Sequence, residues 1–327
     1  MKAIIFTEYG SPDNLHLKDL PQPAPKANEV LIKVHAVALN AADVHALRAD
    51  PFFLRFIFGL FKPKRQTLGA DVAGSVEAVG KHVTQLKVGD EVFGDLSGVG
   101  FGGLAEYVCA PESILALKPA NLSFAEAAAA PMASVTALQG LRTGNIQAGQ
   151  KVLVYGASGG VGSFAVQIAK ALGAEVTAVC SPSKIEWARS LGADHILDYT
   201  RDNITQSGHR YDLILAANGK RALSEFESAL TSTGTFVIAG GAISQIFKTM
   251  FIAPFKSKKG GRAFHNIASQ PSQADLNTVK GWIESGKVKP AVDKQYPLSK
   301  TPEAMRYLEA GHARGKVVIT IIQTQTG

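Results

Sequence analysis

The chain has 327 residues, of which 46% are hydrophobic and 19% charged, with a formal net charge of +7. This composition predicts a globular protein with two domains. Cys109 and Cys180 are the two cysteines, too few for a disulfide framework or a four-cysteine zinc site. We expect a cytoplasmic protein, since the sequence has neither a secretory signal nor an apolar run of membrane-spanning length. The basic residues form no recognised nucleic-acid motif, so we expect no nucleic-acid partner.

The first third of the chain predicts a compact β-rich domain. Short apolar runs alternate with Gly, Pro and Asp turn signals. The predicted strands are Ala3–Phe6, Glu29–Ala38, Asp71–Val79, Glu91–Phe93 and Glu106–Cys109. Ser123 is a good N-cap, with Glu126 as capping-box partner, for a helix that Pro131 interrupts and Ser134–Gly140 resumes. We place this first domain at residues 1–124.

Strands and helices alternate after Gln150, which predicts a parallel sheet covered by helices on both faces. The predicted strands are Lys151–Tyr155, Glu175–Cys180, Asp194–Leu197, Asp212–Ala216 and Thr235–Ala239, with helices at Ser163–Leu172 and Lys184–Leu191. The fold class is therefore α/β, and this doubly wound domain covers residues 125–268. Residues 269–327 contain two helices, Gln273–Glu284 and Pro302–Glu309, and a strand, Lys316–Ile322, expected to return to the first domain.

A glycine-rich turn follows the strand that ends at Tyr155. It reads Ala157-Ser158-Gly159-Gly160-Val161-Gly162, which is the dinucleotide fingerprint with Ala in place of the first glycine. Small residues let the turn close and let backbone N–H groups approach a pyrophosphate, which a helix N-terminus also attracts. We predict that these six residues bind a cofactor. A strand-turn-helix without a nucleotide is the alternative.

The residues after the second strand favour NADPH over NADH. A site for NAD places a carboxylate there, whereas Cys180-Ser181-Pro182-Ser183-Lys184 has none. Ser181 and Lys184 suit a 2′-phosphate, and the two serines can also cap the helix beginning at Lys184. Two small-residue segments, Ala216–Gly219 and Ala239–Gly241, follow later strands of the same sheet. They predict cofactor contacts by Asn218, Ala239 and Gly240, with ordinary strand-ending turns as the alternative.

Several motifs follow one another in a characteristic order. They are Leu68-Gly69-Ala70-Asp71 with Gly74, Val76 and Val79-Gly80; Val88-Gly89-Asp90 with Val92; Gly102-Gly103 with Ala105-Glu106-Tyr107; and the 157–162 turn. Together they resemble the medium-chain dehydrogenase/reductase superfamily, in its zinc-free quinone oxidoreductase, zeta-crystallin-like branch. The resemblance spans nearly the whole chain. It implies a GroES-like catalytic domain, a Rossmann NADP-binding domain, a homodimer, and NADPH-dependent hydride transfer to quinones or α,β-unsaturated carbonyls.

The chain departs from the zinc-dependent members at each expected ligand position. The matching residues are Asn40, Gly69-Ala70-Asp71 and Met132. Zinc takes three or four Cys, His or carboxylate ligands, which this set does not supply. We therefore expect no metal. Oxidation of an alcohol is disfavoured, because nothing evident would polarise it.

The resemblance also implies individual roles. Asn40 and Asp43 are similar to the polar pair lining the nicotinamide and substrate site, and Thr136 to a threonine contacting the nicotinamide. Lys184 and Tyr199 resemble a pair that binds the 2′-phosphate, and Gly315-Lys316 a segment touching the cofactor. Charge develops on the substrate oxygen during hydride transfer, and the Asn40 amide can donate to it. Asp43 either orients Asn40 or His45 or is a helix N-cap. No residue stands out as a general acid.

Two aromatic segments with basic residues, 51–65 and 246–256, allow three interpretations. They form a lid over a lipophilic substrate, dock on a membrane surface, or pack in the core or a dimer interface. We favour a lid or packing, because aromatic stretches of soluble proteins are more often buried. The alternative to an enzyme is an NADPH-binding but catalytically idle structural or membrane-associated protein.

Overall fold

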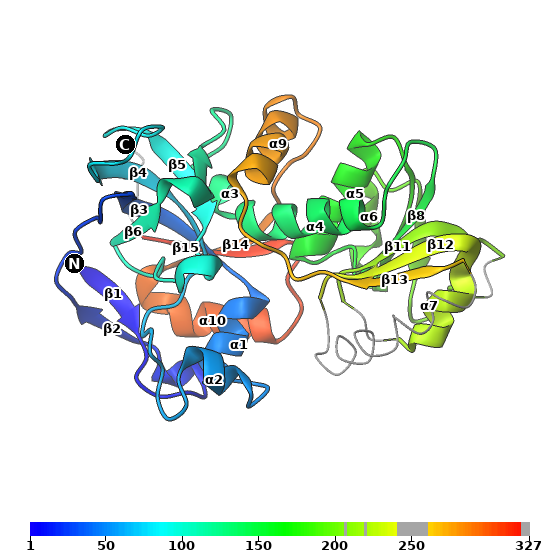
Figure 1. Ribbon diagram of the computed structural model, residues 1–327. Helices are drawn as coiled ribbons and strands as arrows, with labels where there is room; N and C mark the ends of the chain where they lie inside the picture. Colours follow the sequence, from blue (N-terminus) through cyan, green and yellow to red (C-terminus); the bar gives the residue numbers. More distant parts are fainter. Residues whose placement is uncertain (206–207, 219–220, 241–260, 322–327) are drawn as a thin grey trace. The chain divides into compact units, whose positions relative to one another are not determined.

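A computed structural model of the chain describes residues 1–205, 208–218, 221–240 and 261–321. Two compact units are present (Figure 1): Met1–Met132, Pro271–Glu284 and Pro290–Gly327 form the first, and Ala133–Gln270 and Ser285–Lys289 the second. The sequence placed the boundaries after residues 124 and 268, whereas the units divide after Met132 and Gln270. Gly219, Gly241 and segment 246–256 lie outside the described residues. None of the described helices is both long and apolar enough to cross a bilayer.

The second unit is built on a sheet of six parallel strands. Its strands are β8 (Lys151–Tyr155), β9 (Glu175–Cys180), β10 (His195–Asp198), β11 (Tyr211–Ala216), β12 (Leu230–Ile238) and β13 (Ala263–Asn266). Their spatial order is β10-β9-β8-β11-β12-β13, and every neighbouring pair is parallel. This is the doubly wound order of a Rossmann fold, which places ligands at the carboxyl ends of the strands. The predicted α/β fold class is confirmed.

Helices lie on both sides of this sheet. Figure 1 shows α5 (Gly160–Ala171) and α6 (Ile185–Ser190) on one side and α7 (Leu223–Ala229) on the other. Strand β13 was not predicted, because the sequence near Phe264 shows no clear alternation. The Phe264 ring lies 6.1 Å from that of Phe236, so aromatic packing on β12 holds a strand that local pattern does not reveal.

A seven-stranded sheet forms the core of the first unit. Its strands are β3 (Glu29–Leu39), β4 (Asp71–Val79), β5 (Glu91–Asp95), β6 (Tyr107–Pro111), β7 (Leu115–Leu117), β14 (Val292–Pro297) and β15 (Lys316–Thr320). The order is β14-β15-β3-β4-β5-β7, with β6 also paired to β3. A separate pair joins β1 (Lys2–Ile5) to β2 (His16–Asp19). Strand β15 pairs antiparallel with β3, so the end of the chain returns to the first domain.

Short helices pack against this sheet or against one another. They are α1 (Ala41–Arg48), α2 (Leu54–Phe58), α3 (Phe124–Ala128), α9 (Gln273–Glu284) and α10 (Thr301–Glu309), with 3₁₀ turns at Pro12–Asn14, Ser97–Val99, Glu112–Ile114 and Leu298–Lys300. Ser123 and Glu126 form the predicted capping box of α3. Pro131 begins α4 (Pro131–Thr143) rather than interrupting a helix, because its fixed φ and missing N–H suit a first helical position.

Candidate active site

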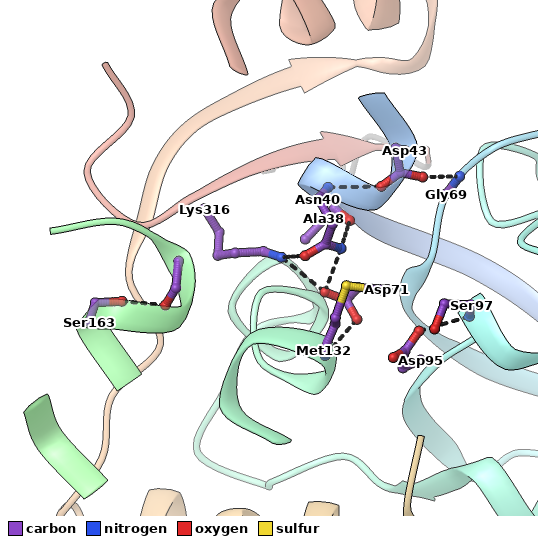
Figure 2. A network of polar contacts seen from close by, with 11 residues as sticks. Ala38, Asn40, Asp43, Gly69, Asp71, Asp95, Ser97, Met132, Ser163 and Lys316 are labelled. Atoms are coloured by element: carbon purple, nitrogen blue, oxygen red, sulfur yellow. Dashed lines mark hydrogen bonds and ion pairs between the residues drawn. The ribbon is translucent and has the colours of Figure 1, made fainter. Parts of the chain in front are cut away.

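Four polar side chains form a row across four neighbouring strands of the first unit. Lys316 is the first residue of β15, Asn40 follows β3, Asp71 begins β4 and Asp95 ends β5. Strand β15 pairs with β3, β3 with β4 and β4 with β5, in registers that align these four positions. All four side chains are buried. Buried polar groups need partners. Lys316, Asn40 and Asp71 are partners of one another, and the backbone N–H of Ser97 donates to Asp95 (Figure 2).

A buried ion pair lies at the centre of this row. The Lys316 ammonium donates to Asn40 Oδ1, and Lys316 Nζ lies 3.0 Å from Asp71 Oδ2. Asp71 also accepts from Asn40 Nδ2 at 2.9 Å and from the Met132 backbone N–H at 2.8 Å. A buried pair holds only when geometry is good and the remaining lone pairs are satisfied. Both conditions are met by this carboxylate, which has three donors.

The Asn40 amide is committed within the same cluster. Its nitrogen donates to Asp71 and, at 3.2 Å, to the Ala38 carbonyl, and an amide nitrogen has two hydrogens. A donor role for Asn40 toward a substrate oxygen would require one of these bonds to break. Lys316 has three N–H groups and two known partners; among the described residues nothing accepts from the third. The ammonium is therefore the better-placed donor.

Asp43 positions backbone rather than acting as a helix N-cap. Asn40 is the N-cap of α1, and the Asp43 carboxylate accepts from the backbone N–H groups of Asn40 and Gly69, both at 2.8 Å. Complete burial, only partly offset by these two bonds, raises the pKa of Asp43 to about 6. The His45 ring bonds the Asp50 carbonyl at 2.9 Å. Asp43 therefore orients Asn40, the first of the two roles anticipated.

Asp95 completes the row and was missed by the sequence analysis. Its carboxylate accepts the Ser97 backbone N–H at 2.8 Å. Burial, and then the charge of Asp71, raise the pKa of Asp95 to about 7. The signal available in the sequence was a second carboxylate at the end of a short strand with an apolar centre, Glu91-Val-Phe-Gly-Asp95. That signal is weak alone, because its meaning depends on pairing with a strand that begins at Asp71.

The residues that match the ligand positions of zinc-dependent members do not fit zinc. Asn40 and Asp71 are brought together, but an ammonium occupies the space between their oxygens. Met132 contributes its backbone N–H, which repels a cation, and Ala70 is buried without a donor. In the described part of the chain no three His, Cys, Asp or Glu side chains converge. The oxygens of Asn40 and Asp71 hold the Lys316 ammonium, and the set lacks the three or four ligands that Zn²⁺ takes.

The glycine-rich turn of the second unit connects β8 to α5. Gly156 has a φ of +81°, and a Cβ on Gly162 would lie 2.1 Å from the Gly156 carbonyl oxygen. The turn itself thus requires both glycines. Gly156 is the glycine that turns the chain, whereas the predicted motif begins one residue later, at Ala157. Ala157 is fully buried and its N–H donates to the Val179 carbonyl.

Gly159 has no such internal reason to be glycine. It is the N-cap of α5 with extended backbone, and an added Cβ would come no closer than 3.7 Å to its nearest neighbour. The open space lies at the first-turn N–H groups of the helix, where Gly160 and Val161 begin α5. A missing side chain there fits the close approach of a pyrophosphate. Ser158, within this turn, is buried.

The residues proposed for the 2′-phosphate follow β9 and β10. Ser181 is the N-cap of a 3₁₀ turn at Pro182–Lys184, and the Tyr199 backbone N–H donates to the Cys180 carbonyl at 3.2 Å. These strands are adjacent and parallel, so the segments end at one edge. Arg221 donates to the Tyr199 carbonyl at 3.1 Å. Arg221 is a cation that the sequence analysis missed, because it lies after a different strand.

Three further residues that are predicted to contact the cofactor lie at the same edge of the sheet. The Asn218 backbone N–H donates to the Tyr155 carbonyl at 3.4 Å, and that of Ala239 to the Ala216 carbonyl at 2.9 Å. A Cβ on Gly240 would lie 2.8 Å from the Ala217 carbonyl oxygen. Asn218 thus follows β11, which is the neighbour of β8. Ala239 and Gly240 follow β12, the next strand of the sheet.

Three predicted residues remain: Thr136, Gly315 and Lys316. Thr136 is buried within α4 of the second unit. Gly315 has a φ of +92° and a Cβ there would lie 2.4 Å from the Ala291 carbonyl oxygen, so it serves the turn into β15. Lys316 was predicted to touch the cofactor. Its ammonium engages Asn40 and Asp71 of the first unit, and its contact with the cofactor stays a prediction.

The chain is similar in sequence and in fold to known proteins. Residues 26–120 match the family described as alcohol dehydrogenase GroES-like domain, and residues 191–319 the family described as zinc-binding dehydrogenase. A 2-methylene-furan-3-one reductase from Solanum lycopersicum is 38% identical over 98% of this chain and 79% of its own. An NADPH-dependent alkenal/one oxidoreductase from Arabidopsis thaliana is 37% identical over the same shares. The structure of a quinone oxidoreductase from Coxiella burnetii superposes with a TM-score of 0.88, at 29% identity, over 98% of this chain and 99% of that one.

The chain therefore belongs to the medium-chain dehydrogenase/reductase superfamily, in its quinone oxidoreductase branch. The GroES-like and Rossmann components that the resemblance implied are both present. The dinucleotide-binding fold and the relatives together make the chain an NAD(P)H-dependent oxidoreductase.

Proposed function

We propose that the chain reduces α,β-unsaturated carbonyls or quinones by hydride transfer from NADPH, without zinc. The observation that carries the proposal is the Lys316 ammonium held between Asn40 and Asp71, at positions where zinc-dependent relatives place ligands. The relatives named as alkenal/one, 2-methylene-furan-3-one and quinone reductases support the substrate class. A small electrophilic molecule is the expected partner.

The second unit supplies the residues that hold NADPH. The open N-terminus of α5 at Gly159, Gly160 and Val161 receives the pyrophosphate. Lys184, Tyr199 and Arg221 bind the 2′-phosphate, which gives the preference over NADH. When bound, the cofactor supplies the hydride. Asn218, Ala239 and Gly240 are small or polar residues at the same strand ends, where backbone can approach the nicotinamide riboside.

The first unit supplies the charge that hydride transfer needs. Negative charge grows on the substrate oxygen as the carbon skeleton gains hydride. The third N–H of Lys316 donates to that oxygen, while Asp71 and Asn40 fix the ammonium in place. Asp43 in turn fixes the Asn40 backbone. The acceptor gains the hydride, and water supplies one proton. No buried general acid is therefore required. The positive charge of Lys316 thus stabilises the negative charge on the substrate oxygen, as the metal ion does in zinc enzymes.

Stopped-flow oxidation of NADPH tests the proposal directly. Purified enzyme is mixed with 1,4-benzoquinone, 9,10-phenanthrenequinone and a panel of 2-alkenals, before and after exhaustive treatment with a chelator. We expect turnover that survives chelation. Absence of turnover with every electrophile would leave an NADPH-binding but idle protein. Turnover that is lost on chelation and restored by Zn²⁺ would overturn zinc independence. The proposed homodimer is tested in parallel by light scattering.

A further inference from the structure

The segment after α1 presents apolar side chains to solvent. Phe52 and Phe53 precede α2, Phe56 and Ile57 lie within it, and Leu60 and Phe61 follow it; all six are exposed, and Phe61 is 90% exposed. We call them the apolar patch. Core packing, one of the interpretations favoured from the sequence, is wrong for these residues. Such a contiguous apolar surface marks a site of interaction.

The patch is held in place rather than hanging loosely. Its opposite side is anchored by Phe58, whose ring lies 6.0 Å from that of Phe101 in the core of the unit. Tyr9 Oη donates to the Gly59 carbonyl at 2.7 Å. The Gly59 N–H closes α2 by donating to the Arg55 carbonyl. Figure 1 shows α2 beside α1. One side of this segment is thus packed against the unit, while the other side, which carries the apolar patch, is exposed to solvent.

Basic residues accompany the patch. Lys62, Lys64 and Arg65 are exposed and follow Phe61 directly, and no acidic residue occurs between Pro51 and Arg65. Within the described ranges, no ion pair engages any of these three cations. The apolar patch is therefore bordered by uncompensated positive charge.

Arg55 extends this pattern. Its guanidinium lies 5.2 Å from the centre of the Phe52 ring and 5.1 Å from that of Tyr9. A cation stacked on aromatic rings keeps its charge beside an apolar surface. The patch and its border thus combine aromatic rings with positive charge. In such a surface the aromatic side chains can enter the acyl layer of a bilayer while Lys and Arg contact anionic headgroups.

We propose that the apolar patch and Lys62, Lys64 and Arg65 dock the protein on the surface of an anionic lipid bilayer. Charge decides between this occupant and a second copy of the chain. A twofold contact joins the same surface of both copies, so it would set these cations near their own counterparts. An anionic leaflet supplies the opposite charge. Docking would bring the enzyme to lipophilic acceptors dissolved in the bilayer.

Vesicle co-sedimentation of the full chain tests the proposal. Vesicles contain phosphatidylcholine alone or with phosphatidylglycerol, at low and at high salt. We compare the wild type with Phe56→Ser/Phe61→Ser, which removes apolar contacts, and with Lys62→Glu/Lys64→Glu, which reverses charge. Val88→Ser and Lys81→Glu/Lys87→Glu are matched controls, because these residues are also exposed but lie outside the patch. Thermal melting confirms that each variant is folded.

We expect the wild type and both controls to sediment with anionic vesicles and to be released by salt. Each basic side chain near an anionic leaflet contributes about fivefold to binding, so the charge-reversed variant should bind roughly 25-fold more weakly or worse. The Phe56→Ser/Phe61→Ser variant should also lose binding. A Phe61→Trp variant should show blue-shifted emission on anionic vesicles, whereas a Val88→Trp variant should not.

Three results would overturn the proposal. The first is no sedimentation of the wild type even at low salt. The second is equal loss of binding in the patch variants and the controls. The third is loss of a dimer, or a raised KM for a soluble acceptor, in patch variants of a protein that does not bind vesicles. That outcome would assign the patch to a second copy or to a substrate lid. NADPH oxidation with a soluble quinone, measured without vesicles, distinguishes failure of docking from failure of the proposed reductase activity.

Discussion

Lys316 Nζ lies 3.0 Å from Asp71 Oδ2, although 245 positions of sequence separate the two residues. Both side chains are buried, on strands that flank β3 on either side. The pair therefore joins the last strand of the chain to the sheet of the first domain. Because a buried ion pair is sensitive to the loss of either partner, it supplies a test of stability and, separately, a test of catalysis.

Removing the ammonium alone should destabilise the protein strongly. Lys316→Met leaves the Asp71 carboxylate buried without a counter-charge, and breaking a buried pair in this way costs about 3–5 kcal/mol. Lys316→Met/Asp71→Asn removes both charges and should recover most of that loss. Urea unfolding measures both, with exposed Lys81→Met as the control. Additive losses in the double variant would show that the two groups do not interact.

The double variant also tests the proposed catalytic role. Lys316→Met/Asp71→Asn lacks the proposed donor to the substrate oxygen but keeps the residues of the second unit that are proposed to bind NADPH. We expect kcat to fall by about 10²–10³-fold, the usual effect of losing an oxyanion donor, with the Kd for NADPH unchanged. Single-turnover kinetics and fluorescence titration give the two quantities. A kcat within a few fold of the wild type would remove Lys316 from the mechanism.

Asp95 should make stability depend on pH. Its pKa is raised from an ordinary value of 3.8 to about 7 by burial and by the charge of Asp71. The folded state therefore binds a proton that the unfolded state releases between these values. This contribution to stability is fully present below pH 3.8 and is lost as the pH rises through 7.

The Asp95→Asn variant isolates that contribution. It keeps an oxygen to accept the Ser97 N–H but does not titrate. Between pH 4 and 7 the free energy of unfolding should fall more steeply in the wild type, by at most about 1.4 kcal/mol per pH unit for one proton. Asp43 titrates in both proteins and cancels in the comparison. Parallel curves would mean that Asp95 is ionised throughout this range.

Elements set by local pattern were predictable from the sequence. Strands Lys151–Tyr155 and Glu175–Cys180 and helix Gln273–Glu284 have the predicted bounds, because apolar periodicity and flanking turn signals agree there. Strands β7 and β14 were missed. Leu115–Leu117 has three residues, and Val292–Pro297 is largely polar, so each is a strand only because a neighbour offers it hydrogen bonds.

Some features of the candidate site could likewise be predicted from local sequence, and others could not. The geometry of the turn at 157–162 was predictable because the strand, the glycines and the helix that form it lie within one stretch of sequence. The role of Lys316 was not, since its partners are set by the pairing of β15 with β3. The exposure of the apolar patch likewise ran against composition, because hydrophobicity indicates burial only on average.

Lys184 should discriminate between the two cofactors. The 2′-phosphate is present in NADPH alone, and a hydrogen bond to a charged group is worth about 1.5–3 kcal/mol. Lys184→Ala should therefore weaken the binding of NADPH by roughly 10- to 100-fold and leave the affinity for NADH nearly unchanged. Arg189→Ala, which removes a nearby exposed cation paired with Glu186, is the control. Equal losses for both cofactors on fluorescence titration would place Lys184 outside the phosphate site.

Two neighbouring glycines should separate folding from binding. Gly162→Ala forces a Cβ to within 2.1 Å of the Gly156 carbonyl oxygen, so the turn must shift, and we expect a loss of about 1–3 kcal/mol of stability or more. Gly159→Ala meets no atom closer than 3.7 Å. Its less favourable N-cap and its stiffer unfolded chain have opposite effects on stability, so the change should stay below about 1 kcal/mol.

The Gly159→Ala methyl group should nevertheless obstruct the pyrophosphate. Because that group is common to both cofactors, affinity for NADPH and NADH should fall together, unlike the selective loss in Lys184→Ala. Urea unfolding and fluorescence titration of the same preparations give stability and affinity. If Gly159→Ala bound both cofactors as tightly as the wild type, the space above the first turn of α5 would not be where the pyrophosphate binds.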